Sequence, residues 1–224
     1  MAPNSGAVQT SGSGGLANGW WKAYLETIPG GYLDLLAAEE DASRIVHFHP
    51  TFVPGLLQTE SYAAAITPAT TLKAITSDDA RTLVHVKLSR QRAALEGSRL
   101  KELVFLMDET ALRRPVGSPA TMRDQLSHLL EMAEHPMVTL VVVPFGGQPH
   151  PGLLGAFMLM QYGGGLDDVL CFEWQMGNQV IRNQPGLIGR YRELAEDLAG
   201  ADPDGTAARE RIASALAENH EPGR

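Results

Sequence analysis

The chain has 224 residues, of which 44% are hydrophobic and 20% charged, as is ordinary for a soluble globular protein. Its net charge of −8 disfavours nucleic acid and anionic membranes as main partners, because both repel an acidic surface. No apolar run approaches a membrane span, and residues 1–15 lack the pattern of a signal peptide. The single cysteine, Cys171, is typical of a reducing compartment. We therefore expect a cytoplasmic protein.

Composition and periodicity predict one folded domain between two tails. Residues 1–19 are rich in Ser, Gly, Asn and Ala, which is typical of a disordered tail or linker. Residues 20–220 are long enough to bury one core, and residues 221–224 form a short tail.

The apolar pattern predicts helices first and most strands later. In chain order we expect a helix at 21–28, a helix at 32–45, an extended stretch at 47–55, a helix ending near 65, a helix at 78–95, a strand at 104–108, a helix at 119–134, strands at 138–143, 156–162, 169–174 and 179–181, and helices at 185–198 and 206–218. This order indicates an α+β fold: a mixed sheet with a C-terminal antiparallel meander, covered by helices.

Several strings of residues also occur together in a known family. They include Val53-Pro54-Gly55-Leu56-Leu57-Gln58-Thr59, Asp108-Glu109 followed by Leu112-Arg113-Arg114-Pro115-Val116-Gly117, and His150-Pro151-Gly152. With these strings the chain resembles the C-terminal domain of actinobacterial Xre-type helix-turn-helix regulators, which are antitoxin-like and whose C-terminal domain has no assigned function. The resemblance runs in order from about residue 20 to 218. It implies a regulatory domain that binds a small metabolite or a small companion protein.

The DNA-reading half of such regulators has no counterpart in the sequence. Only nineteen low-complexity residues precede Trp20, and they contain no lysine or arginine and no apolar helical pattern. We therefore do not expect direct binding to nucleic acid.

Four charged residues lie at and just after the end of the predicted strand at 104–108. Asp108, Glu109, Arg113 and Arg114 could clamp an anion or a carboxylate, since arginine offers a planar fork of donors. The alternative is an ion-pair and capping network that anchors the loop before the helix at Pro119. Acid–base chemistry by the paired acids is disfavoured, because nearby arginines lower a carboxyl pKa.

Three further side chains are candidates for contact with a ligand. His150 lies in a loop rich in Gly and Pro and could act as a base, bind a ligand or cap the loop. Gln58 could orient a ligand beside the free N–H groups of the next helix, although residues 53–59 could equally plug the core. Trp174 belongs to a set of aromatic and methionine residues in the meander, one face of which could line an apolar pocket.

A metal site is not expected. His47 and His49 have the spacing that places both on one face of a strand, which is formally a metal pair. No cysteine or third histidine lies nearby in the sequence.

These observations leave two functions open. The first is a non-enzymatic domain that binds a small metabolite or companion protein, without cofactor or membrane, with a homodimer as a further option. The alternative is an enzyme derived from a regulator, which promotes cyclisation or isomerisation of an apolar secondary metabolite without a cofactor. In that case His150, Glu109 and Asp108 are the best candidates for catalysis.

Overall fold

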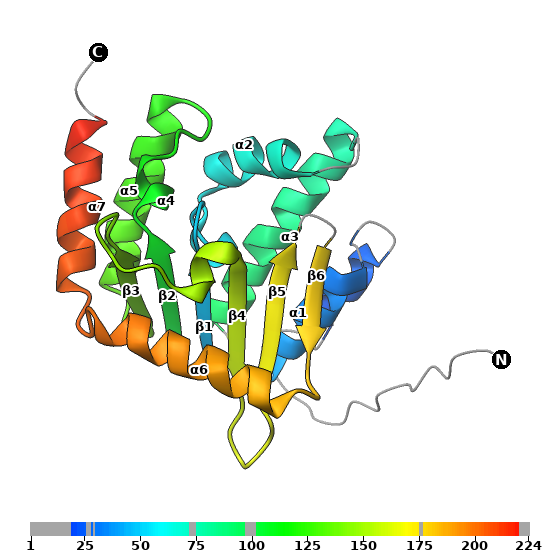
Figure 1. Cartoon of the computed structure of the whole chain (residues 1–224). Coiled ribbons are helices and arrows are strands. Elements are labelled where there is room, and N and C mark those ends of the chain that lie inside the picture. The colour runs from blue at the N-terminus through cyan, green and yellow to red at the C-terminus, as the bar shows by residue number, and fades with distance from the viewer. Residues whose placement is uncertain are drawn as a thin grey trace.

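The computed structural model describes residues 19–25, 28, 30–71, 75–96, 102–174 and 177–219, in which a six-stranded sheet lies between helices (Figure 1). The predicted tails at 1–19 and 221–224 lie outside these ranges, except for residue 19. The 3-10 helices are η1 (Trp20–Tyr24), η2 (Gly55–Leu57) and η3 (Pro151–Leu154). The α-helices are α1 (Gly30–Glu40), α2 (Glu60–Thr70), α3 (Ser77–Glu96), α4 (Thr110–Arg113), α5 (Pro119–Ala133), α6 (Pro185–Gly200) and α7 (Thr206–Glu218). The strands are β1 (Arg44–His49), β2 (Glu102–Asp108), β3 (Val138–Val143), β4 (Ala156–Gln161), β5 (Val169–Trp174) and β6 (Gly177–Ile181).

The sheet is mixed, with the order β3-β2-β1-β4-β5-β6. Strands β1, β2 and β3 are parallel, whereas β4, β5 and β6 each run antiparallel to the strand before them in the sheet. This arrangement confirms the predicted α+β fold with an antiparallel C-terminal meander. Parallel neighbours need long crossovers, and helices α2 to α5 supply them.

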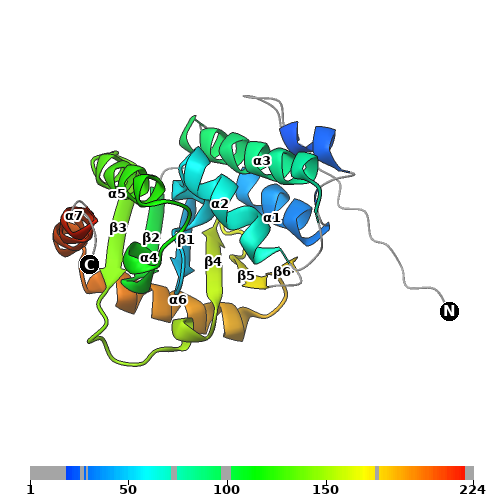
Figure 2. The same ribbon diagram turned by 90° about the horizontal axis from the view of Figure 1, so that it is seen from above.

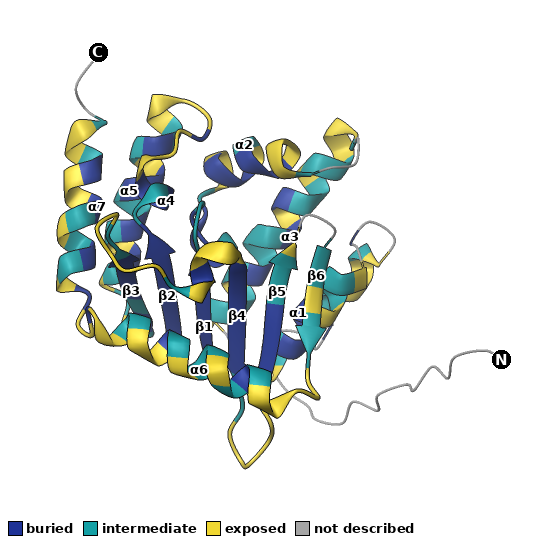
Figure 3. Cartoon of the chain, in the orientation of Figure 1, coloured by how far each residue is buried: buried dark blue, intermediate teal, exposed yellow. Residues whose placement is uncertain are grey.

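Helices cover both faces of the sheet, and Figure 2 shows α1, α2, α3 and α5 on one face and α6 on the other. The central strands are buried on both sides, as Figure 3 shows. On β1, Ile45 packs into the larger core beneath α2 and α5, whereas Val46 and Phe48 pack into the smaller core beneath α6. No helix in the described ranges is both long and apolar enough to cross a membrane.

The joint between the last two helices is held by a buried carboxylate. Asp202 is only 7% exposed, and it accepts hydrogen bonds from the backbone N–H groups of Ala207 and Ala208 at 3.1 and 2.7 Å. These are N–H groups of the first turn of α7, which have no partner within the helix.

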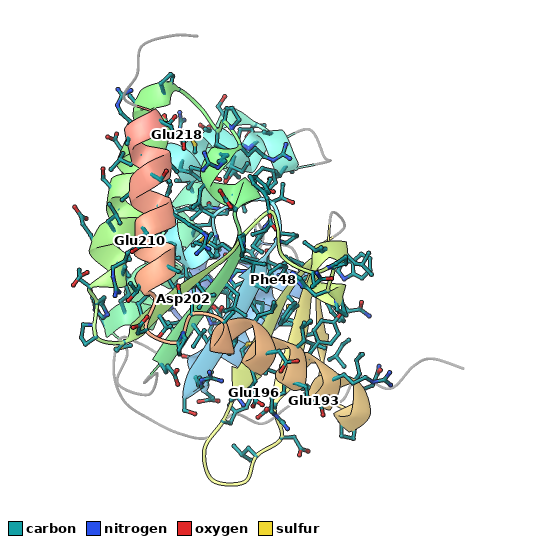
Figure 4. The ribbon with its side chains drawn as sticks, turned by 60° about the vertical axis from the view of Figure 1, so that its left-hand side comes forward. Phe48, Glu193, Glu196, Asp202, Glu210 and Glu218 are labelled. Carbon is teal, nitrogen blue, oxygen red and sulfur yellow. The ribbon has the colours of Figure 1, made fainter. Side chains whose placement is uncertain are left out.

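Acidic side chains such as Glu193 on α6 and Glu210 on α7 remain exposed, and Figure 4 shows where they lie.

The first strand was not predicted correctly. The helix expected at 32–45 ends at Glu40, and Arg44–His49 forms β1 at the centre of the sheet. A strand that is buried on both faces is usually a nearly continuous apolar run, but Arg44, His47 and His49 interrupt that run in β1, and Ile45 was therefore assigned to the preceding helix. The extended stretch expected at 47–55 covers only the second half of β1 and the loop after it.

Candidate functional site

A pocket of about 630 Å³ lies beyond the carboxyl end of β1, where the parallel and antiparallel parts of the sheet meet. One side comes from α2 and α3, and the other from η3 and from the adjoining ends of β5 and β6. Open sheets often bind ligands beyond the carboxyl ends of their parallel strands. The following residues line the pocket: Tyr32, His49, Pro50, Thr51, Phe52, Val53, Gly55, Gln58, Ile66, Ala69, Thr70, Thr71, Lys87, Arg90, Leu153, Leu154, Gly155, Ala156, Glu173, Trp174 and Asn178.

The loop between β1 and α2 forms one wall of the pocket and is held by buried side chains. Gln58 is 5% exposed, and its Nε2 donates to the carbonyl of Val53 at 2.8 Å. The hydroxyl of Tyr62 accepts a hydrogen bond from the N–H of Val53 at 3.3 Å. Both backbone groups of Val53 are therefore satisfied, as a buried loop requires.

Two further glutamines fasten the same loop to helices α3 and α5. Gln91 Nε2 donates to the carbonyls of Gly55 and Gln58 at 2.9 and 2.7 Å. Gln125 is fully buried; its Nε2 donates to the Leu57 carbonyl at 2.7 Å, and its Oε1 accepts from the N–H of Thr59 at 2.8 Å. These contacts give a physical reason for the Val53–Thr59 string that supports the family resemblance.

His49 ends β1 and presents one nitrogen atom to the loop. Its Nδ1 accepts hydrogen bonds from the N–H groups of Thr51 and Phe52 at 3.1 and 3.0 Å. In the neutral ring the proton must then reside on Nε2. Burial lowers the pKa of His49 to about 4, with Glu173 opposing this shift and His47 and Lys87 adding to it. The ring is therefore neutral at pH 7 and serves as an N–H donor.

A carboxylate on β5 faces the histidines of β1. Oε1 of Glu173 lies 3.1 Å from Nε2 of His47, whose side chain is fully buried. These two atoms do not have the geometry of a hydrogen bond. Burial would raise the pKa of Glu173, but His47, His49 and Arg90 together hold it well below its usual range. Glu173 is therefore ionised at neutral pH and supplies a negative charge to the pocket.

Lys87 supplies a cation from α3. Its Nζ donates to Thr67 Oγ1 at 3.1 Å and lies 3.5 Å from Gln58 Oε1, and both of these oxygens are neutral. Within the described ranges no carboxylate lies at ion-pair distance from it. Burial lowers the pKa of Lys87 to about 8, with Glu173 opposing the shift and Arg90 adding to it. Lys87 is thus a half-buried amine that keeps an unusually large uncharged fraction near neutral pH.

A buried ion pair builds the wall behind Lys87. Arg90, one helical turn further along α3, donates through Nε to Glu39 Oε2 at 2.7 Å and through Nη2 to the other oxygen of the same carboxylate. Its Nη1 lies 3.4 Å from the hydroxyl of Tyr32, which also lines the pocket. Arginine is suited to such bidentate contact, which fixes α3 against α1.

The rim of the pocket is apolar and exposed. Leu154 is 93% exposed, Trp174 63% and Leu153 45%. Large apolar side chains that gather at the edge of a polar cavity are typical of a binding surface. The pocket therefore combines a charged interior with an apolar entrance.

The predicted site residues divide into two groups. Gln58 and Trp174 line this pocket, whereas Asp108, Glu109, Arg113, Arg114 and His150 are not among its lining residues.

The acids and arginines after β2 contact groups of the protein itself. Asp108 Oδ1 accepts from the N–H of Thr110 at 2.8 Å and also from its hydroxyl. Glu109 pairs with Arg113 at 3.0 Å, and Arg113 also pairs with Glu218 of α7. These contacts are ion pairs and a local cap, and they join α4 to α7.

The remaining two candidates pack against aromatic rings. Arg114 lies over the ring of Phe52, 5.9 Å from its centroid. His150 meets Phe48 edge-on with the ring centroids 5.3 Å apart, and neither of its ring nitrogens has a hydrogen-bond partner among the described residues. Burial lowers the pKa of His150, while Asp108 opposes the shift.

Sequence reasoning missed Lys87, Arg90 and Glu173 as parts of one site. A charged residue between Phe172 and Trp174 in a predicted strand was the available signal, because a glutamate in such a run needs a partner. His47 and His49 do lie near each other, with ring centroids 6.4 Å apart. No set of three or more metal-ligating side chains is found within the described ranges.

Comparison with known proteins identifies a family for the chain. No curated protein and no solved structure matches the chain significantly. A family model described as a domain of unknown function, DUF5753, matches residues 32–214. This range includes every residue that lines the pocket, from Tyr32 to Asn178. The chain therefore belongs to the DUF5753 family.

Proposed function

We propose that the chain is a regulatory-type domain that binds a small metabolite in the pocket beyond β1, without direct contact with DNA. The observation that supports this most is Lys87, a half-buried cation in the pocket whose only hydrogen-bond partners among the described residues are neutral oxygens. A half-buried charge with no carboxylate at ion-pair distance is costly, and a ligand that accepts its hydrogen bonds would offset that cost.

The lining of the pocket favours an amphipathic ligand. A volume of about 630 Å³ is suited to a small molecule rather than a macromolecular segment. Lys87 and the neutral His49 ring offer donors, and Glu173 offers an acceptor, while Leu153 and Trp174 offer apolar contacts at the entrance. We expect the ligand to direct a polar group inward and to leave an apolar part against the rim.

The regulatory role rests on the resemblance to Xre-type regulators. The net charge of −8 supports the absence of direct DNA contact, since phosphate contacts dominate the affinity of DNA-binding proteins.

A small companion protein is the competing partner. The exposed side chains of Leu154 and Trp174 favour it, because a protein that covered the entrance would bury both.

Native mass spectrometry after incubation with host-cell extract separates the two. We expect a small molecule retained by the wild-type protein and by Leu166→Ala, but lost from Lys87→Met. Leu166 is 67% exposed and belongs to the β4–β5 loop, which lies at the opposite end of the strands from the pocket, so it is a matched surface control. Retention of a protein alone, with no effect of Lys87→Met, would refute metabolite binding. A metabolite that Lys87→Met retains as well would place the ligand elsewhere.

A further inference from the structure

We propose that Lys87 is a nucleophile that captures a ligand carrying an aldehyde or ketone and holds it as an iminium ion. This inference rests on the proposed pocket and names the class of ligand that the pocket takes. It adds a covalent step to a binding function.

The position of Lys87 suits this role. Its Nζ lies in a pocket that is open to solvent, beside Thr67 and Gln58, which accept hydrogen bonds without adding a negative charge at ion-pair distance. A lysine held by a carboxylate salt bridge would stay protonated and unreactive. Two neighbours on the same helix, Arg90 and Gln91, fix α3 through Glu39 and the β1–α2 loop. The amine is therefore presented from a rigid element.

The charge state of the Lys87 amine also suits a role as a nucleophile. With a pKa of about 8, Lys87 is about one-tenth uncharged at pH 7, whereas an ordinary lysine is uncharged in about one molecule in three thousand. The charged groups that act on it are Glu173 from β5, which favours the ammonium, and Arg90 from α3, which disfavours it. An amine activated by burial in a partly apolar pocket is a recognised route to imine formation.

The covalent step balances without a cofactor. The nitrogen lone pair forms a bond to the carbonyl carbon, and the carbonyl oxygen takes up protons and leaves as water. Overall, one ammonium and one carbonyl give one iminium and one water, and nothing is oxidised or reduced. The positive charge stays on the nitrogen. Glu173, which is ionised and lines the same pocket, stabilises the iminium as it stabilises the ammonium.

Reductive trapping with benzaldehyde tests the inference. The full chain is incubated at pH 7 with benzaldehyde and sodium cyanoborohydride, digested, and mapped by mass spectrometry. The chain contains four lysines, Lys22, Lys73, Lys87 and Lys101, so the other three are internal references. Apart from the chain's terminal α-amino group, whose ordinary pKa is also about 8, we expect one benzyl group, at Lys87, introduced about tenfold or more faster than at the exposed Lys22.

Two variants and a pH series complete the test. Lys87→Arg keeps a cation but should abolish the fast label, whereas Lys22→Arg should leave it unchanged; circular dichroism confirms that both are folded. The rate at Lys87 should level off above about pH 8, while the rate at Lys22 continues to rise. Equal rates at Lys22 and Lys87 would overturn the iminium.

The outcome is distinguishable from failure of the proposed function. Equal labelling rates at Lys22 and Lys87, together with a noncovalent metabolite that Lys87→Met fails to retain, would refute the iminium but support metabolite binding in the pocket. Fast labelling of Lys87, together with a retained companion protein and no metabolite, would support Lys87 as a nucleophile and refute metabolite binding.

Discussion

Replacing Arg90 tests whether the ion pair between Arg90 and Glu39 is shielded from solvent and stabilises the fold. Its side chain is 6% exposed and that of Glu39 10%, and the two form a bidentate pair. Methionine fills much of the arginine stem but leaves the carboxylate of Glu39 buried without its partner. Breaking a buried pair in this way costs about 3–5 kcal/mol, out of about 5–15 kcal/mol for a typical domain. We expect Arg90→Met to lose that much stability in urea unfolding at pH 7.

The control is Arg92→Met, which makes the same change at an exposed position of the same helix and should cost less than about 0.5 kcal/mol. The double variant Glu39→Gln with Arg90→Met should cost less than the sum of the two single changes, because neither charge is then left alone. If Arg90→Met unfolds at the same urea concentration as Arg92→Met, the pair is solvated and this reasoning fails. Because Arg90 also lines the pocket, a folded Arg90→Met should retain less ligand in the native mass measurement.

Two further changes test His49, which lines the pocket, and Gln125, which holds the β1–α2 loop. The pKa of His49 falls from about 6.5 in the unfolded chain to about 4 in the folded chain. Between these pH values the unfolded state binds more protons than the folded state. His49 therefore contributes stability that is lost as the pH falls from 6.5 towards 4. His49→Asn, which keeps an acceptor for the loop N–H groups, should flatten the change in urea midpoint between pH 7 and pH 5; an unchanged slope would contradict the shift. Gln125→Leu leaves the Leu57 carbonyl and the Thr59 N–H without their partner, and should cost about 2–4 kcal/mol against near zero for the exposed Gln148→Leu. A thermal or urea scan in which these two variants coincide would show that water replaces the glutamine.

The lower limit of pH 5 keeps a second group out of the measurement. Glu173 has a lowered pKa, so it contributes stability that is present above its unfolded value of 4.5 and lost below it. Between pH 5 and 7 His150, whose pKa is also lowered, contributes with the same sign, so the share of His49 is the difference in slope between the wild-type protein and His49→Asn.

Secondary structure was predictable wherever one pattern dominated. The strands expected at 104–108 and 138–143 correspond to β2 and β3, and the long helix expected at 78–95 corresponds to α3. β1 was missed because its residues are buried on both faces and show neither strict alternation nor helical spacing. α4 is a single turn, too short for any periodic signal.

The candidate site was predictable only in part. Gln58 and Trp174 were identified as residues that could contact a ligand, and both line the pocket. The charged string at the end of β2 attracted attention because four charges lie close together in sequence. Of these, Asp108 and Glu109 accept backbone N–H groups, Arg113 pairs with Glu109 and with α7, and Arg114 lies over the ring of Phe52. Proximity in sequence indicates local pairing as readily as a site.

By itself, the sequence determined the class of fold and most of its elements, because apolar periodicity and the glycine and proline residues that end helices and strands are local properties. It also contained the loop string whose backbone is held by Gln58, Gln91 and Gln125. Only the tertiary structure decided which charges share a pocket. Lys87 comes from α3, Glu173 from β5 and His49 from β1, and the order of the strands in the sheet brings them together. Their pKa shifts arise from burial and from one another's fields, which depend on distances in space that spacing along the chain does not encode.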